Sequence, residues 1–235
     1  MNNLVRGTIF LLVIAFVLVP GKGFAQTRGE LTARIERAQE YLKDIMEAPD
    51  TAIPKSIMES CHGVIILRQY KAGFVFGVKG GDGIVLVKDN NTGQWSPPAF
   101  IQTGEGSFGP QIGAQSIDSI FLIMNKEGMD MLNKTKFKIG VDASAAVGPV
   151  GRDAEAKVGP GTAILVYSRA KGLYAGASFE GGILLNDNAA NEKFYNVKNI
   201  TLQEIVFERK VNMPEEAKPL INLLHNYISD AEKVK

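Results

Sequence analysis

Apolar and polar residues alternate strictly in the middle of the chain, and this stretch predicts the main structural element. Every second residue from Phe137 to Val147 is apolar, and lysines and small or polar residues occupy the positions between. A period of two over this length predicts a half-buried β-strand. The turn-rich run Gly148–Asp153 follows, and the alternation resumes at Ala154. We therefore expect residues 136–156 to form one long β-hairpin.

Shorter apolar runs predict further strands on both sides of this hairpin. Residues 117–124 and 162–167 are almost continuously apolar, as is typical of strands covered on both faces. Glycine-rich turns are expected at 80–83 and 89–93, and Pro97-Pro98 excludes a central position in a ladder. The remaining strand candidates are 63–67, 74–78, 84–87, 173–179 and 182–185.

Helical patterns lie toward the two ends of the chain. Thr27-x-x-Glu30 has the spacing of a capping box, and the apolar stripe after it predicts an amphipathic helix from Glu30 to Ala48, ended by Pro49. The same spacing returns at Thr201-x-x-Glu204, and Pro214 opens a last helical pattern. Short helices are expected at 54–60 and 125–134.

These elements predict an α+β fold: a mainly antiparallel, glycine-rich, curved or barrel-like β-sheet braced by N- and C-terminal helices. A chain of 235 residues is long enough for one generous core or two small ones. We expect a single domain over residues 26–235. Within it, 26–62 would hold the N-terminal helices, 63–195 the β body and 196–235 the C-terminal helices.

The first 25 residues have the pattern of a secretory signal peptide. Arg6 precedes an apolar run from Thr8 to Val19, and Gly23-Phe24-Ala25 provides the small residues of a cleavage site. The run is shorter than the roughly 20 apolar residues of a spanning helix, so an uncleaved anchor is the less favoured alternative. Cleavage after Ala25 would make the protein periplasmic or secreted, where it could lie peripherally on a membrane.

The charge balance argues against one class of partner. Cleavage would remove two of the 26 basic residues and none of the 25 acidic ones, which leaves a net charge of about −1. Nucleic-acid phosphates require a basic footprint. We therefore expect no nucleic-acid binding.

Three sequence features suggest catalysis or cofactor binding, but for each of them we favour a structural explanation. Gly104–Gly109 has the spacing G-x-G-x-x-G, but a nucleotide fingerprint continues into a helix, and here Pro110 follows. We expect tight sheet corners there instead. Cys61 and His62 are neighbours in sequence, whereas catalytic pairs are usually assembled from distant positions. One cysteine and two histidines supply no metal-ligand cluster. We expect no enzyme activity, no cofactor and no metal.

Basic residues mark the outward positions of the predicted hairpin. Phosphate headgroups could gather among them, since each cation contributes about 1 kcal/mol near an anionic membrane. A solvated sheet face with compensating acidic residues is the alternative. The candidate headgroup-binding residues are Lys71, Lys136, Lys138, Arg152, Lys157, Arg169 and Lys171.

Several stretches in order match one known family. They are KAGFVFGVKGGDGIVLVKD (71–89), WSPPAF (95–100), GSFGPQIGAQ (106–115), KFKIGVDASAAVGPVGRDAEA (136–156) and YSRAKGLYAGASFEGGILL (167–185). With the segment 191–195, the match covers about Ile53 to Leu224. On these stretches the chain resembles the SYLF family, also described as the yeast actin-patch or Las17-binding lipid-binding domain, in a secreted bacterial form.

The resemblance implies a β-rich, barrel-like domain that binds phosphoinositides and other anionic lipids, with actin binding in fungal members. It implies no catalytic motif. Actin is not an expected partner here, because the N-terminal pattern directs the chain out of the cytoplasm. The expected function is non-enzymatic binding of anionic phospholipid headgroups at a membrane surface in the bacterial envelope. A structural or protein-interaction module of the envelope, without a specific lipid ligand, stays open as the alternative, and so does the oligomeric state.

Overall fold

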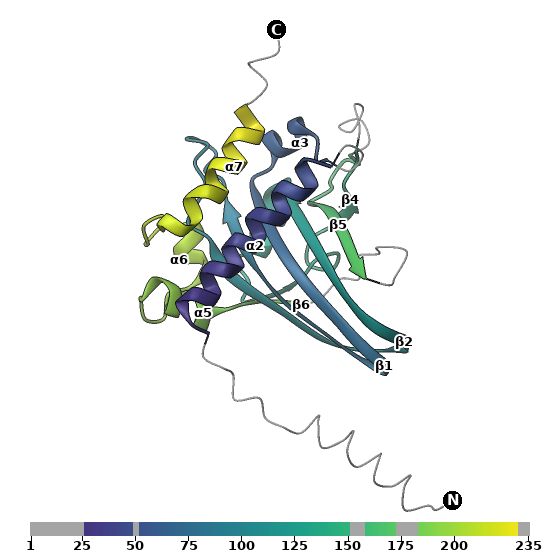
Figure 1. Cartoon of the computed structure of the whole chain (residues 1–235). Helices are drawn as coiled ribbons and strands as arrows, with labels where there is room; N and C mark the ends of the chain where they lie inside the picture. The colour runs from purple at the N-terminus through teal and green to yellow at the C-terminus, as the bar shows by residue number, and fades with distance from the viewer. Residues whose placement is uncertain (1–25, 49–51, 151–157, 173–182, 230–235) are drawn as a thin grey trace, which may run out of the picture.

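A strongly curved β-sheet forms the centre of the molecule, and helices pack on both of its faces (Figure 1). This computed structural model describes residues 26–48, 52–150, 158–172 and 183–229, with the backbone alone for 71–79, 105–115 and 169–172. The predicted α+β class with a mainly antiparallel, curved sheet is confirmed. Among the described residues, no helix is both long enough and apolar enough to cross a membrane.

The sheet is built around two antiparallel strands of 25 residues each, β1 (Gly63–Val87) and β2 (Ala99–Ile123). Their pairing runs from Gly63 opposite Ile123 to Val85 opposite Ala99. Figure 1 shows the two strands extending together beyond the helices. The turn expected at 89–93 lies in the connection between them, where Gly93 adopts φ +70°.

β1 bends back on itself, so that its first and second halves lie against each other. A Cβ added at Gly81 would lie 2.1 Å from the carbonyl oxygen of Arg68, and one at Gly83 would lie 2.3 Å from that of Ile66. Only glycine allows two backbones to approach so closely. The turn predicted at 80–83 is therefore wrong. These glycines lie within β1 and allow its two halves to approach each other closely.

The pairing of β1 and β2 has an irregularity near the middle of both strands. Phe74 lies opposite Ile112, whereas Phe76 lies opposite Phe108, so three residues of β2 stand against Val75 alone. Pro110 is one of the three, and proline is tolerated at such a bulge because it has no N–H for the ladder. The G-x-G-x-x-G motif thus lies on a strand that leads into a bulge, and no helix follows it.

Four shorter strands complete the six-stranded sheet, in the order β3-β6-β2-β5-β4 with β1 beside β2. Their bounds are Lys136–Lys138 for β3, Ala145–Val147 for β4, Ile164–Gly172 for β5 and Ile183–Asn186 for β6. β6 pairs with β2 over 101–103, and β5 pairs with it over 115–123. β3 is added to β6, and β4 is added to β5 in parallel.

The continuous strand predicted over 137–147, the first arm of the long hairpin expected over 136–156, is not formed. It is divided into β3 and β4, which pair with β6 and β5. The chain turns directly after β3, where Gly140 adopts φ +85° and the backbone nitrogens of Val141 and Asp142 donate to the carbonyl of Lys138. The alternation also fails, because Val141 is 73% exposed and Val147 is 86% exposed. The expected hairpin continuation at 151–157 lies outside the described residues.

One face of the sheet is covered by α2 (Arg28–Met46), α3 (Lys55–Ser60) and α7 (Lys218–Ser229) (Figure 1). α2 is the predicted amphipathic helix, and the capping box of Thr27 and Glu30 is present at its start. Its apolar stripe packs on even-numbered residues of β1 and β2. Leu31, Ile35, Leu42, Ile66, Ile84, Phe100, Ile120 and Leu122 belong to this core.

The opposite face is covered by α4 (Lys126–Met131) and α6 (Leu202–Val206), which pack on a core that includes the odd-numbered residues of β1 and β2. The second capping box, Thr201 with Glu204, begins α6 as predicted. A helix that the sequence did not predict, α5 (Asn188–Tyr195), follows β6, and a short 3-10 turn, η2 (Glu215–Ala217), precedes α7. Both faces of the sheet are therefore buried where the helices cover it.

Candidate functional site

β3 carries two of the predicted headgroup-binding lysines at the edge of the sheet. Phe137 is buried between them and lies opposite Leu184, while Lys136 and Lys138 lie opposite Leu185 and Ile183. Residues alternate between the faces of a strand, so both lysines share the face away from Phe137. Lys136 is exposed, and Lys138 is half-buried.

The residues that follow β3 form a tight turn with an ion pair. Asp142 accepts hydrogen bonds from Lys134 Nζ at 2.6 Å and from the Lys138 backbone nitrogen at 2.7 Å. These two bonds, with the one from Lys134 first, lower the pKa of Asp142 below its ordinary value. The same segment exposes Val141 and Val147 almost fully. We call residues 134–150 the β3–β4 segment.

Five predicted headgroup-binding cations lie outside β3, and the structure describes the backbone of three of them. The backbone pairing sets Lys71 opposite Gln115, Arg169 opposite Asp118 and Lys171 opposite Ser116. These three therefore flank one stretch of β2, on strands β1 and β5, whereas β3 joins the sheet through β6. Arg152 and Lys157 lie outside the described residues. The register thus divides the placed cations into two groups and does not join them in one cluster.

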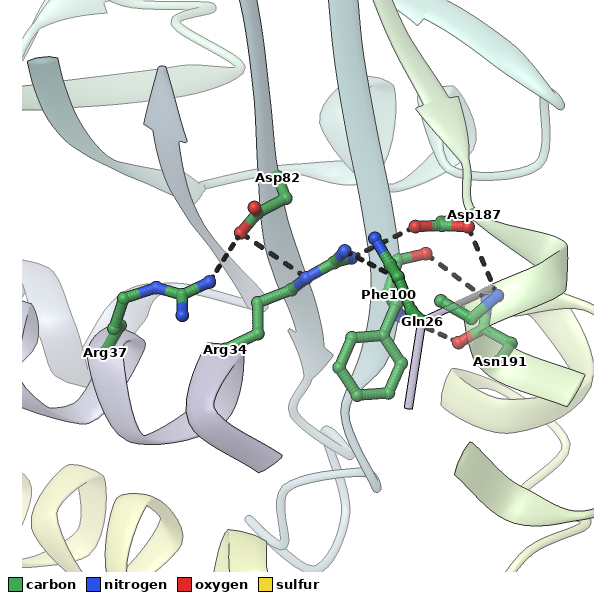
Figure 2. Close-up of polar contacts among 8 residues, drawn as sticks. Gln26, Arg34, Arg37, Asp82, Phe100, Asp187 and Asn191 are labelled. Atoms are coloured by element: carbon green, nitrogen blue, oxygen red, sulfur yellow. Dashed lines mark hydrogen bonds and ion pairs between the residues drawn. The ribbon is translucent and has the colours of Figure 1, made fainter. Parts of the chain in front are cut away.

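A buried ionic network links α2 to the sheet and to α5 (Figure 2). Arg34 donates from Nη1 to Asp187 at 3.1 Å and from Nη2 to Gln26 at 3.0 Å, and its Nε lies 3.4 Å from Asp82. Arg37 donates to the same Asp82 oxygen at 3.2 Å. The Arg34 side chain is only 4% exposed, so these carboxylates compensate a charge that is almost removed from water.

Asn191 of α5 completes the network by binding the β2 backbone. Its Oδ1 accepts from the Phe100 nitrogen at 2.7 Å, and its Nδ2 donates to the Phe100 carbonyl at 3.3 Å (Figure 2). Asp187 caps α5 by accepting from Ala190. Sequence reasoning missed these residues, because the partners of Arg34 lie far from it along the chain and no local spacing marks them. Their arrangement positions helices, and the hollow beside Arg34 and Asp82 has a volume of about 20 Å³, which is room for about one water molecule and not for a substrate.

A second buried pair joins the first half of β1 to β2. Arg68 donates from two nitrogens to the two carboxylate oxygens of Asp118, and Tyr41 of α2 donates to the Asp118 carbonyl at 2.6 Å. The bonds to Asp118 raise the pKa of Arg68. This pair fixes α2 against the bent strand.

Cys61 and His62 do not form a catalytic pair. Cys61 is fully buried and donates to the Met58 carbonyl at 3.1 Å, and burial raises the pKa of its thiol to about 11. The Nδ1 of His62 lies 2.8 Å from Asn90 Oδ1. Within the described part of the chain, no three His, Cys, Asp or Glu side chains come together as metal ligands.

The sequence comparisons identify the family. Residues 104–227, more than half of the chain, match the model described as "Ysc84: Las17-binding protein actin regulator". The chain belongs to this family. The resemblance to the SYLF family is thereby confirmed, and the secreted bacterial form stays a prediction.

Individual relatives agree with the Ysc84 assignment. Protein YSC84 of Saccharomyces cerevisiae is 31% identical over 75% of this chain and 38% of its own length. The SH3 domain-containing YSC84-like protein 1 of Xenopus laevis is 30% identical over 86% of this chain and 62% of its own length. The chain therefore spans less than two thirds of these relatives. No solved structure matches it.

Proposed function

We propose that this Ysc84-family chain is a non-enzymatic binding module that attaches to anionic phospholipid surfaces through the β3–β4 segment. The observation that supports this proposal is the combination of exposed lysine and exposed valine on one short segment. Lys134 and Lys136 are exposed there, and so are Val141 and Val147. Large apolar side chains exposed beside cations are suited to a membrane surface.

The two kinds of side chain would contribute in different ways. Each lysine near an anionic headgroup layer contributes about 1 kcal/mol, and this contribution falls with added salt. A valine that enters the headgroup and acyl boundary removes apolar area from water. The turn at Gly140 and the bonds to Asp142 hold the valine positions in place before contact, so little order has to be gained on binding.

Vesicle co-sedimentation tests the proposal. Residues 26–235 are used, so that the apolar N-terminal run cannot insert by itself. Binding to phosphatidylserine-containing vesicles and weak binding to phosphatidylcholine vesicles are expected. The proposal fails if both vesicles bind the protein equally and negligibly.

A lysine variant locates the surface. Lys136→Ser with Lys138→Ser removes two cations, and we expect about thirtyfold weaker binding to anionic vesicles, equivalent to about 2 kcal/mol. Lys43→Ser with Lys218→Ser is the matched control, because these exposed lysines lie on α2 and α7, outside the β3–β4 segment. Equal weakening by the two double variants would assign the effect to net charge and not to this segment.

A protein partner is the second candidate function. A relative in Saccharomyces cerevisiae is the LAS seventeen-binding protein 3, whose name is that of a protein-binding protein. β4 lies at one end of the strand order and exposes Ala145, Ala146 and Val147, a geometry suited to pairing with another extended chain. Purification of the protein with a stoichiometric partner and without co-purified lipid would favour this candidate.

The cellular site of binding is part of the proposal. The support is the pattern of residues 1–25, which is that of a cleaved secretory leader. The intact mass of protein recovered from the cell envelope tests it. A mass that corresponds to a chain beginning at Gln26 would agree with the proposal, and a mass that corresponds to a chain with residues 1–25 would contradict it.

A further inference from the structure

Two open hollows meet at the end of the β1–β2 hairpin. Their volumes are about 470 Å³ and about 560 Å³, and they share four lining residues, so they adjoin each other, and we call the two together the groove. The shared residues are His62, Lys88, Asp89 and Asn90. α4 and the end of α6 border one side of this groove, and α3 and α7 border the other.

Two cations in this groove have neutral hydrogen-bond partners. Lys88 donates to the carbonyl of Glu59 at 2.5 Å, and Arg209 donates from Nη2 to the carbonyl of Gln94 at 2.8 Å. A carbonyl oxygen orients a cation without neutralising it. Both side chains line the smaller hollow, of about 470 Å³, together with Lys126, so positive charge faces this space.

The acidic residues of the groove are already engaged. Asp89 accepts from the backbone nitrogens of Asn91 and Thr92, and these bonds are the main reason that its pKa is lowered. Asp130 accepts from Lys126 at 2.7 Å. Lys88 and Arg209 thus donate their hydrogen bonds to uncharged oxygens, while the charge of Arg209 also helps to lower the pKa of Asp89.

The backbone at Arg209 is strained in a way that presents its side chain. Among the described residues other than glycine, positive φ occurs at Asn196, Asn199 and Arg209, and Arg209 has φ +53°. Asparagine tolerates this region, but a long side chain adopts it at a cost. Backbone strain of this kind is often found at functional sites. Here the guanidinium of Arg209 binds the Gln94 carbonyl in the loop after β1.

An apolar wall adjoins these cations. Met129, Val206 and Phe207 line the same hollow as Lys88 and Arg209. Phe207 is 37% exposed, although it is a large aromatic residue at the end of α6. Cations beside apolar side chains match a ligand with an anionic head and a hydrocarbon body.

We propose that this groove binds an anionic amphiphile, with a phosphate or carboxylate group held by Lys88 and Arg209 and the apolar body against Met129 and Phe207. The site involves none of the β3–β4 lysines, so it stands independently of the proposed membrane surface. A lipid headgroup and a free metabolite share this chemistry, and the comparison of ligands below separates them.

Calorimetric titration of the full chain tests the site with hexyl phosphate, inorganic phosphate and hexanol. We expect hexyl phosphate to bind and hexanol not to bind. Weaker binding of inorganic phosphate than of hexyl phosphate would show that the apolar wall contributes and would favour a lipid-like ligand. Equal affinity of the two phosphates would overturn the amphiphile assignment, and absence of binding by both would overturn the site.

Arg209→Gly separates binding from folding. Glycine adopts positive φ without strain, so the variant should keep the melting temperature of the parent while it loses one charge-assisted hydrogen bond to the ligand. Hexyl phosphate should then bind about tenfold to a hundredfold more weakly. Asn199→Gly is the matched control, because it makes the same backbone change outside the groove and should leave binding unchanged. Unaltered affinity in Arg209→Gly would overturn the proposal, whereas vesicle binding through Lys136 and Lys138 would be unaffected by either result.

Discussion

At the residue scale, the carboxylate of Glu204 shows how local bonds set a protonation equilibrium. Its pKa is lowered to about 2, first by the hydrogen bond from Lys210 and then by the bonds from the backbone nitrogen and the hydroxyl of Thr201. Since the ordinary value is 4.5, the folded state favours the ionised form. Its stabilising contribution is therefore complete above pH 4.5 and is lost as the pH falls toward 2.

Glu204→Gln makes this contribution measurable. We expect the variant to unfold at a lower temperature than the parent at pH 7, and the difference to shrink between pH 4.5 and pH 2. Thermal unfolding across this range provides the measurement. Glu36→Gln, an exposed change on α2, is the control and should show no such closing difference. A difference that persists unchanged at pH 2 would contradict the assignment.

Local spacing explains why some residues could be predicted and others could not. Thr27 with Glu30 and Thr201 with Glu204 were found from sequence, because the partners of a capping box are always three residues apart. Arg34 and Asp187 are 153 residues apart, and nothing near either one identifies the other. The groove cations Lys88 and Arg209 were missed for the same reason.

At the element scale, α2 is held by charge as well as by its apolar stripe. Arg34→Met would leave Asp187 buried beside an apolar side chain, so we expect a loss of about 3–5 kcal/mol in the free energy of unfolding. Lys43→Met is the matched control on the same helix, because the pair of Lys43 with Glu47 is exposed and long at 3.9 Å. Denaturant unfolding of the two variants measures the difference. Equal small losses would mean that the network of Arg34 contributes little.

Periodicity predicted elements well and their partners poorly. The apolar stripe in α2 correctly predicted a helix, and the apolar runs in β2 and β5 correctly predicted strands. The alternation over 136–156 suggested a hairpin, but a period of two says only that a strand is half-buried and not which strand lies beside it. The structure pairs β3 with β6 and β4 with β5, through hydrogen bonds that no local pattern encodes.

At the scale of the whole molecule, the two halves of the bent strand β1 approach each other closely. Gly81→Ala would place a methyl group 2.1 Å from the Arg68 carbonyl oxygen, and we expect a loss of about 1–3 kcal/mol or more in unfolding free energy. Gly80→Ala is the control at the adjacent residue, where the nearest atom would lie at 3.8 Å, an ordinary contact. Similar stability of both variants would show that the two halves of β1 can move apart at Gly81 without a loss of stability.

The bulge opposite Val75 has a consequence for how this sheet can change in length. β2 advances four residues there while β1 advances two, and both numbers are even. Odd-numbered residues consequently face the same core before and after the bend, as Ile65 with Val85 and Ile101 with Phe121 illustrate. An insertion or deletion of one residue would reverse inside and outside for half of a 25-residue strand, whereas two residues would restore it. Length differences among related chains at this bend should therefore occur in multiples of two.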